Sequence, residues 1–117
     1  MAFDLEAHLT RQMVFSRATF GPGERMDSVL DHIGKEIEEV RASRGESSEW
    51  VDLVILSLDG LTRRLWASAP DKSADEIANA ACRIIRGKQA RNELRRWPDW
   101  RTADADKAIE HIRGEGD

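Results

Sequence analysis

Residues 49–59 read EWVDLVILSLD, an almost wholly apolar run that nevertheless contains the acidic residues Glu49, Asp52 and Asp59. The run shows no alternation of apolar and polar residues, so we expect a helix over 49–67 that is apolar on nearly every face. Such a helix is typical of the centre of a helical domain, and we expect it to be the most buried element. Ionised carboxylates in an apolar setting are costly unless they are paired, so these acids need partners.

The rest of the chain also has the periodicity of helices. The predicted helices are 4–17, 25–42, 49–67, 74–96 and 104–113. Gly21-Pro22-Gly23 separates the first two, and Ser73-x-x-Glu76 is a capping box that opens the fourth. No segment alternates like a strand. We therefore predict an all-α fold, a helical bundle with four main helices plus a short C-terminal helix.

Length, charge and cysteine content narrow the class of protein. The chain has 117 residues, which predicts one domain over 1–117 with a mobile tail at 114–117. Its net charge of −4 argues against a nucleic-acid polymer as partner. No apolar run approaches the ~18 residues that span a bilayer, and we expect neither a signal peptide nor membrane binding. A single cysteine, Cys82, excludes an intramolecular disulfide. We expect a cytoplasmic protein, or one in the host cytoplasm if it is viral.

A second pair of acids, Glu36 and Glu39, precedes the apolar run. Because successive helical residues turn by roughly 100°, Glu36 falls at the edge of an apolar stripe and Glu39 roughly 60° further round. The connection to the helix 49–67 is short, so the two helices should be antiparallel neighbours. They should then bring Glu36 and Glu39 close to Glu49 and Asp52. Four carboxylates in one place raise each other's pKa values unless a cation lies among them. Oxygen ligands of this kind select Mg²⁺ or Mn²⁺.

Other interpretations of these acids stay open. A Glu-x-x-Glu pair is commonly solvated helix surface, and Glu49 could be a first-turn acid favoured by the helix dipole. Asp59 shares a sector of roughly 80° with Glu49, Asp52 and Arg63. It could fix its helix or bind a second metal ion. It could equally form a salt bridge with Arg63, four residues on.

Several segments together resemble the all-α nucleoside triphosphate pyrophosphohydrolases of the MazG type. Their Glu-x-x-Glu and Glu-x-x-Asp motifs match the two acidic pairs, and their Lys-x-x-x-Asn-x-x-Arg motif matches Lys88 to Arg95. The similarity is greater to the dATP/dGTP diphosphohydrolase branch, of the phage MazZ type. The segments that match this branch are Thr19–Gly23, Ser48–Asp52 and Lys88–Arg101. The resemblance covers about residues 8–113, and the nine residues between the acidic pairs are fewer than in many members.

The resemblance implies an enzyme that splits the bond between the α- and β-phosphates, with Mg²⁺ or Mn²⁺ as cofactor. The implied metal ligands are Glu36, Glu39, Glu49 and Asp52. We favour Glu39 as the acid that activates water, with Glu36 beside it. The implied substrate is a purine nucleoside triphosphate, above all dGTP, with dATP and GTP as further candidates. In phages of this branch the product dGMP feeds the synthesis of diaminopurine nucleotide.

Candidate substrate-binding residues lie in the last third of the chain and at Asp59, which could contact a guanine edge. Lys88 and Arg95 would bind phosphates and Asn92 the sugar or a phosphate, although each could be plain helix surface. Trp97 and Trp100 would stack on a purine, or instead pack the C-terminal segment. Because a few short helices cannot cover an apolar helix on every face, we expect a homodimer or homotetramer. The alternative to an enzyme is a non-catalytic helical interaction or regulatory module.

Overall fold

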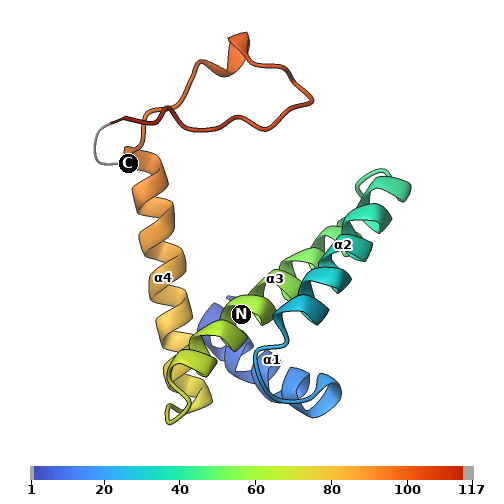
Figure 1. Cartoon of the computed structure of the whole chain (residues 1–117), viewed down its shortest axis with the longest axis vertical. Coiled ribbons are helices and arrows are strands. Elements are labelled where there is room, and N and C mark those ends of the chain that lie inside the picture. Colours follow the sequence, from blue (N-terminus) through green and yellow to red (C-terminus); the bar gives the residue numbers. More distant parts are fainter. Residues whose placement is uncertain (1, 115–117) are drawn as a thin grey trace. The chain divides into compact units, whose positions relative to one another are not determined.

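The computed structural model describes residues 2–114 and contains four α-helices (Figure 1). They are α1 (Leu5–Phe20), α2 (Met26–Ala42), α3 (Ser47–Ser68) and α4 (Ala74–Leu94), followed by one 3-10 turn, Trp100–Thr102. No strand occurs in the described residues, so the prediction of an all-α fold is confirmed. The four main helices begin and end within three residues of their predicted bounds. None of the helices in the described part is long and apolar enough to cross a membrane.

The chain divides into two compact units, Met1–Arg83 and Ile84–Asp117, and α4 runs across the boundary. The single domain over 1–117 stays a prediction. Of the tail that was predicted to be mobile, residues 115–117 lie outside the described part of the chain.

The first unit is organised around α3, which contacts both α1 and α2 (Figure 1). The chain reverses between α2 and α3 within four residues, so the two helices run antiparallel and side by side. Gly45 makes this turn possible with φ of 81°, a conformation that other residues adopt only with strain. Further along the pair, Gly60 lets α2 approach closely, because a Cβ atom there would lie 3.4 Å from Val29.

The hydrophobic core of the first unit is small and lies between α1 and the beginning of α4. Its buried members are Leu9, Met13, Ile77, Ala78 and Ala81. Leu58, Leu61 and Leu65 of α3 pack against this cluster and are partly buried. The predicted capping box of α4 is present, with the backbone N–H of Glu76 donating to the Ser73 hydroxyl at 3.2 Å. The Ser73 N–H donates in turn to the Glu76 carboxylate at 3.1 Å.

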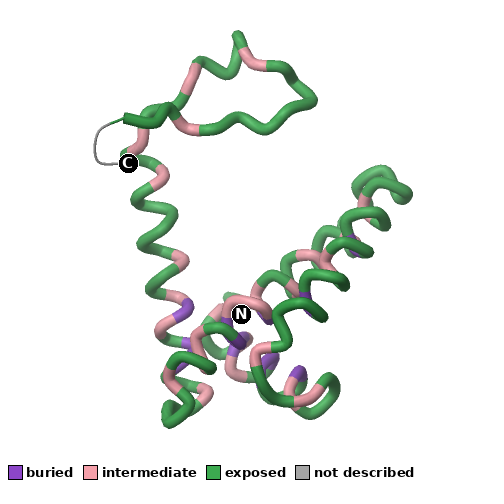
Figure 2. The backbone as a smooth tube through the Cα atoms, viewed as in Figure 1, coloured by how far each residue is buried: buried purple, intermediate pink, exposed green. Residues whose placement is uncertain are grey.

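The prediction that the third helix is the most buried element is wrong for the single chain. Val51 and Val54, in the first half of α3, are 53% and 54% exposed (Figure 2). The buried residues of α3 are instead Asp59, Thr62 and Arg63, in its second half. The reason is geometric: α1, α2 and the beginning of α4 cover only part of the circumference of α3 within the first unit, and Val51 and Val54 lie on the part left exposed.

The prediction of a short helix over 104–113 is also wrong. Within the second unit this segment is non-helical, and it returns to the end of α4. The backbone N–H of Ile112 donates to the Arg96 carbonyl at 2.7 Å, and the His111 ring lies 5.8 Å from that of Trp97. These contacts override the weak helical periodicity of the segment.

Candidate metal centre

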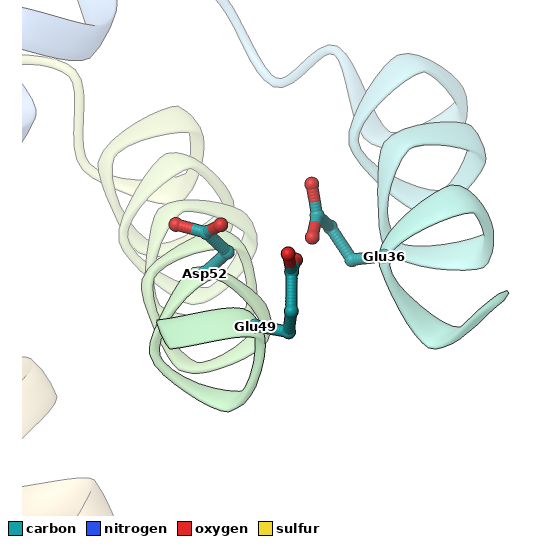
Figure 3. A group of neighbouring side chains, drawn as sticks. All are labelled: Glu36, Glu49 and Asp52. Atoms are coloured by element: carbon teal, nitrogen blue, oxygen red, sulfur yellow. The ribbon is translucent and has the colours of Figure 1, made fainter. Parts of the chain in front are cut away.

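Three carboxylates meet between α2 and α3. Glu36 extends from α2, and Glu49 and Asp52 extend from the first turns of α3 (Figure 3). One oxygen of each lies within 4.8 Å of the others. The spacing of three residues places Glu49 and Asp52 on one face of α3, and the antiparallel turn brings Glu36 opposite them. The structure therefore brings together three of the four acids that the sequence predicted as metal ligands.

The fourth acid, Glu39, lies at the exposed rim of this cluster. It is not among the three residues whose oxygens approach within 4.8 Å. It is nevertheless close enough for its carboxylate to raise the pKa values of both Glu36 and Glu49 through hydrogen bonding and charge. Glu39 itself is exposed to solvent, whereas Glu36 is only 8% exposed. The cluster therefore has a buried side and a side open to water.

Electrostatics make the cluster unfavourable when no cation is present. The pKa of Glu36 is raised above its ordinary 4.5, first by burial and then by Glu39, Asp52 and Glu49. The pKa of Glu49 is raised by burial first and next by the charge of Glu39. Both shifts have the same origin, because negative charges share one site and have lost part of their hydration.

Two of the buried oxygens have no partner. The Oε2 atoms of Glu36 and Glu49 are buried and accept no hydrogen bond. The nearest cationic candidate is His32, whose Nε2 lies 3.7 Å from Glu36 Oε1. Buried carboxylate oxygens are normally satisfied, and two unpaired ones side by side are suited to binding a cation. A divalent cation that prefers oxygen ligands fits this donor set, and all of its donors are carboxylates.

Asp59 does not join the acidic cluster. Its two carboxylate oxygens each accept from Nε of Arg63 at 3.1 Å, and the Ser16 hydroxyl donates to it at 2.7 Å. The salt bridge that the four-residue spacing allowed is thus present. The predicted contact of Asp59 with substrate stays a prediction. The sequence did not identify Arg63 as a buried residue, although the spacing contained the signal.

The remaining candidate residues lie in the second unit. Asn92 accepts from an Arg95 guanidinium N–H at 3.1 Å, and its carbonyl accepts from the Trp97 indole at 2.7 Å. Trp100 is 69% exposed, with the Arg101 guanidinium 5.3 Å from its ring centre. Lys88 is exposed. The packing of Trp97 against the C-terminal segment agrees with the simpler interpretation of that residue. The nucleotide-binding roles of all these residues stay predictions.

Comparison with known families gives one match. The family described as dATP/dGTP pyrophosphohydrolase matches residues 9–115, which include both acidic pairs and the segment Lys88–Arg101. No curated protein and no solved structure matched the chain. The family match favours an enzyme over the non-catalytic module that was the alternative. Because the match covers nearly the whole sequence, the chain belongs to the dATP/dGTP pyrophosphohydrolase family and is a nucleoside triphosphate diphosphatase.

Proposed function

We propose that the enzyme hydrolyses purine nucleoside or deoxynucleoside triphosphates, with dGTP preferred over dATP and GTP, to the monophosphate and pyrophosphate. The observation that carries the proposal is the pair of buried, unpartnered oxygens of Glu36 and Glu49 inside a carboxylate cluster. Membership of the family supports the reaction class. The preference for dGTP, and a role in supplying dGMP for diaminopurine nucleotide synthesis in a phage, rest on the resemblance of the sequence. A host-cytoplasmic location belongs to the same proposal.

The carboxylate cluster would hold Mg²⁺ or Mn²⁺. The ligands would be Glu36, Glu49 and Asp52, with Glu39 completing the set from the exposed rim. When bound, the cation would neutralise charge on the triphosphate and on the leaving pyrophosphate. The absence of histidine and cysteine from the three-residue cluster argues for these hard cations over zinc.

Glu39 is the favoured general base. A water molecule would attack the α-phosphorus and transfer a proton to the Glu39 carboxylate, while the bond from that phosphorus to the bridging oxygen breaks. The exposure of Glu39 supports this role, because water reaches it more easily than it reaches Glu36. The buried Glu36 would orient Glu39 through the contact that raises its own pKa.

The basic residues of the second unit are assigned to the substrate. Lys88 and Arg95 would bind triphosphate oxygens, and Asn92 would bind the sugar or a phosphate. Trp97 and Trp100 are 45% and 69% exposed, and this exposure supports stacking on a purine.

A homodimer or homotetramer completes the proposal. A groove of about 530 Å³ lies between α2 and α3, lined mainly by the apolar residues Met26, Val29, Leu30, Ile33 and Leu61. Leu30 is 54% exposed, and Val54 of α3 is exposed to the same extent. Large exposed apolar surfaces mark interaction sites. A second copy of the chain would cover this surface.

The test is a product analysis in ¹⁸O-labelled water. The purified protein is incubated with each of the eight common nucleoside triphosphates and Mg²⁺ or Mn²⁺, and the products are separated by ion exchange. We expect dGMP and pyrophosphate from dGTP, with ¹⁸O in dGMP, and no turnover in EDTA. Glu49→Gln serves as the inactive control. Production of dGDP and phosphate, or no product from any purine nucleotide, would contradict the proposal.

A further inference from the structure

The guanidinium of Arg63 is buried and uses all of its donors. Its side chain is 3% exposed. Nε donates to both oxygens of Asp59 at 3.1 Å, and Nη1 donates to the carbonyls of Gly21 and Gly23 at 2.9 and 2.7 Å. Nη2 donates to the hydroxyl and carbonyl of Ser16 at 2.8 and 3.3 Å. An arginine has five N–H donors, so none is left unsatisfied and a lysine could not reproduce the arrangement.

These bonds join three parts of the first unit that are distant in sequence. Ser16 lies in the last turns of α1, Gly21 and Gly23 form the loop before α2, and Arg63 lies in α3. Both glycines have φ of 95°, which turns their carbonyls in a way that other residues rarely allow. Helix α2 begins three residues after Gly23, and its N-cap residue Arg25 makes no side-chain capping hydrogen bond. Arg63 therefore links the loop before α2 to α3 through hydrogen bonds. At its other end, α2 is joined to α3 by the short turn between the two helices.

The Gly21–Gly23 loop lies on the same side of the α2–α3 pair as the acids. Ser28, His32 and Glu36 recur every four residues on α2 and so share one face. On α3, Asp52, Leu56, Asp59 and Arg63 are spaced by four, three and four residues and so also share one face. A cavity of about 30 Å³ lies between these faces and the loop, and Phe20, Arg25 and His32 are among its lining residues. The Nε2 atom of His32 also lies 3.7 Å from Oε1 of Glu36. One lining residue of the cavity is therefore next to the carboxylate cluster.

We propose that Arg63 is a positioning residue for nucleotide hydrolysis. It holds the Gly21–Gly23 loop so that Phe20 and Arg25 form a fixed wall for the part of the substrate remote from the phosphates. The inference rests on the proposed function, because it needs a nucleotide whose phosphates lie at the acids. Arg63 follows Asp52 by eleven residues, about 16 Å along α3, so it acts on this wall and not on the metal ligands.

The experiment compares Arg63→Lys with Arg64→Lys. The first variant keeps a positive charge opposite Asp59 but cannot hold both loop carbonyls and Ser16. The matched control changes the adjacent residue, Arg64. This arginine is exposed, and it makes one ion pair, with Glu24 at 3.4 Å. Three quantities are measured for each variant: KM and kcat for dGTP, amide hydrogen exchange of the peptide 19–26, and the midpoint of thermal unfolding.

We expect Arg63→Lys to raise KM at least about fivefold, the effect of one lost hydrogen bond, with kcat changed much less. Exchange in the peptide 19–26 should accelerate in this variant only. A merely structural role would lower the active fraction, and hence apparent kcat, at constant KM; that result overturns the inference. Unchanged KM with unchanged loop exchange overturns it too.

Ser16→Ala is the second variant, in case Arg63→Lys does not fold. It removes only the hydroxyl between Asp59 and Arg63, and it should shift KM and loop exchange in the same direction by less. A Ser16→Ala enzyme with the KM and loop exchange of wild type would then count against the inference. If wild type did not hydrolyse dGTP, the proposed function itself would be wrong. The wild-type assay shows this before any variant is compared.

Discussion

One carboxylate oxygen of Glu36 on α2 lies within 4.8 Å of one of Glu49 on α3, although the Oε2 atoms of both residues are buried without a partner. The turn through Gly45 brings the two residues together, and no cationic side chain lies between them in the described part of the chain. Two acids so placed repel each other and lose hydration. The arrangement lowers the stability of the metal-free protein, and a bound cation would reverse that effect.

The first prediction concerns pH. The pKa values of Glu36 and Glu49 are raised in the folded state, so the native protein binds more protons than the unfolded chain above pH 4.5. The contribution of these groups to stability is therefore present below about pH 4.5 and is lost as pH rises through the raised values. In EDTA, we expect the midpoint of thermal unfolding to fall across this window. A saturating concentration of Mn²⁺ should remove most of the fall; an identical profile with and without Mn²⁺ would contradict the metal site.

A second prediction is that Glu49→Gln stabilises the metal-free protein at neutral pH. The amide keeps the volume of the side chain and removes one charge from the cluster. The same variant should lose the rise in unfolding temperature that Mn²⁺ gives to wild type, because a ligand is gone. Thermal unfolding with EDTA and with Mn²⁺ measures both effects. Glu38→Gln, an exposed position on α2, is the control and should behave as wild type in both conditions.

The third prediction concerns turnover. Glu36→Gln and Asp52→Asn should each lower kcat/KM for dGTP by at least about 100-fold, since even residues behind metal ligands cost 10–100-fold when mutated. Raising the Mn²⁺ concentration should recover part of the loss if the variant binds the metal weakly. Glu38→Gln again provides the matched control. Full activity of Asp52→Asn at low Mn²⁺ would remove that residue from the site.

The local features of the fold could be predicted from the sequence. Helical periodicity and the Ser73-x-x-Glu76 capping box depend on neighbours within one or two turns, and these predictions are confirmed. The approach of Glu36 to Glu49 could be predicted too, because a short connection between two helices leaves few geometries. The segment 104–113 could not, because its structure depends on contacts with Arg96 and Trp97 that helical periodicity does not encode.

Burial was harder to predict than secondary structure. The apolar composition of α3 suggested a buried helix, but its neighbours in the first unit cover only part of it, and Val54 stays exposed. Conversely, nothing in the composition indicates that Arg63 is buried. Its burial depends on five donors that find acceptors in three separate segments, and such a network requires the three-dimensional structure.

A fourth prediction concerns association. If a second copy covers the groove beside Leu30, wild type should sediment as a multiple of 13.2 kDa. Leu30→Lys places a charge on this apolar surface and should shift the protein toward the monomer. Asp31→Lys introduces the same residue one position on, where the side chain is exposed, and should leave the association unchanged. Sedimentation of wild type as a monomer at micromolar concentration would contradict the proposed oligomer.

The last prediction concerns the stability of the buried ion pair. Arg63→Met leaves Asp59 charged and buried, and it also deprives the carbonyls of Gly21 and Gly23 of their donor. Breaking a buried pair from one side costs about 3–5 kcal/mol. Asp59→Asn also breaks the pair, but it should cost less, because the amide oxygen can still accept a hydrogen bond and the loop carbonyls keep their donor. Urea unfolding at neutral pH measures both. A larger loss for Arg63→Met follows from the carbonyls that only the guanidinium reaches, and equal losses would contradict this expectation.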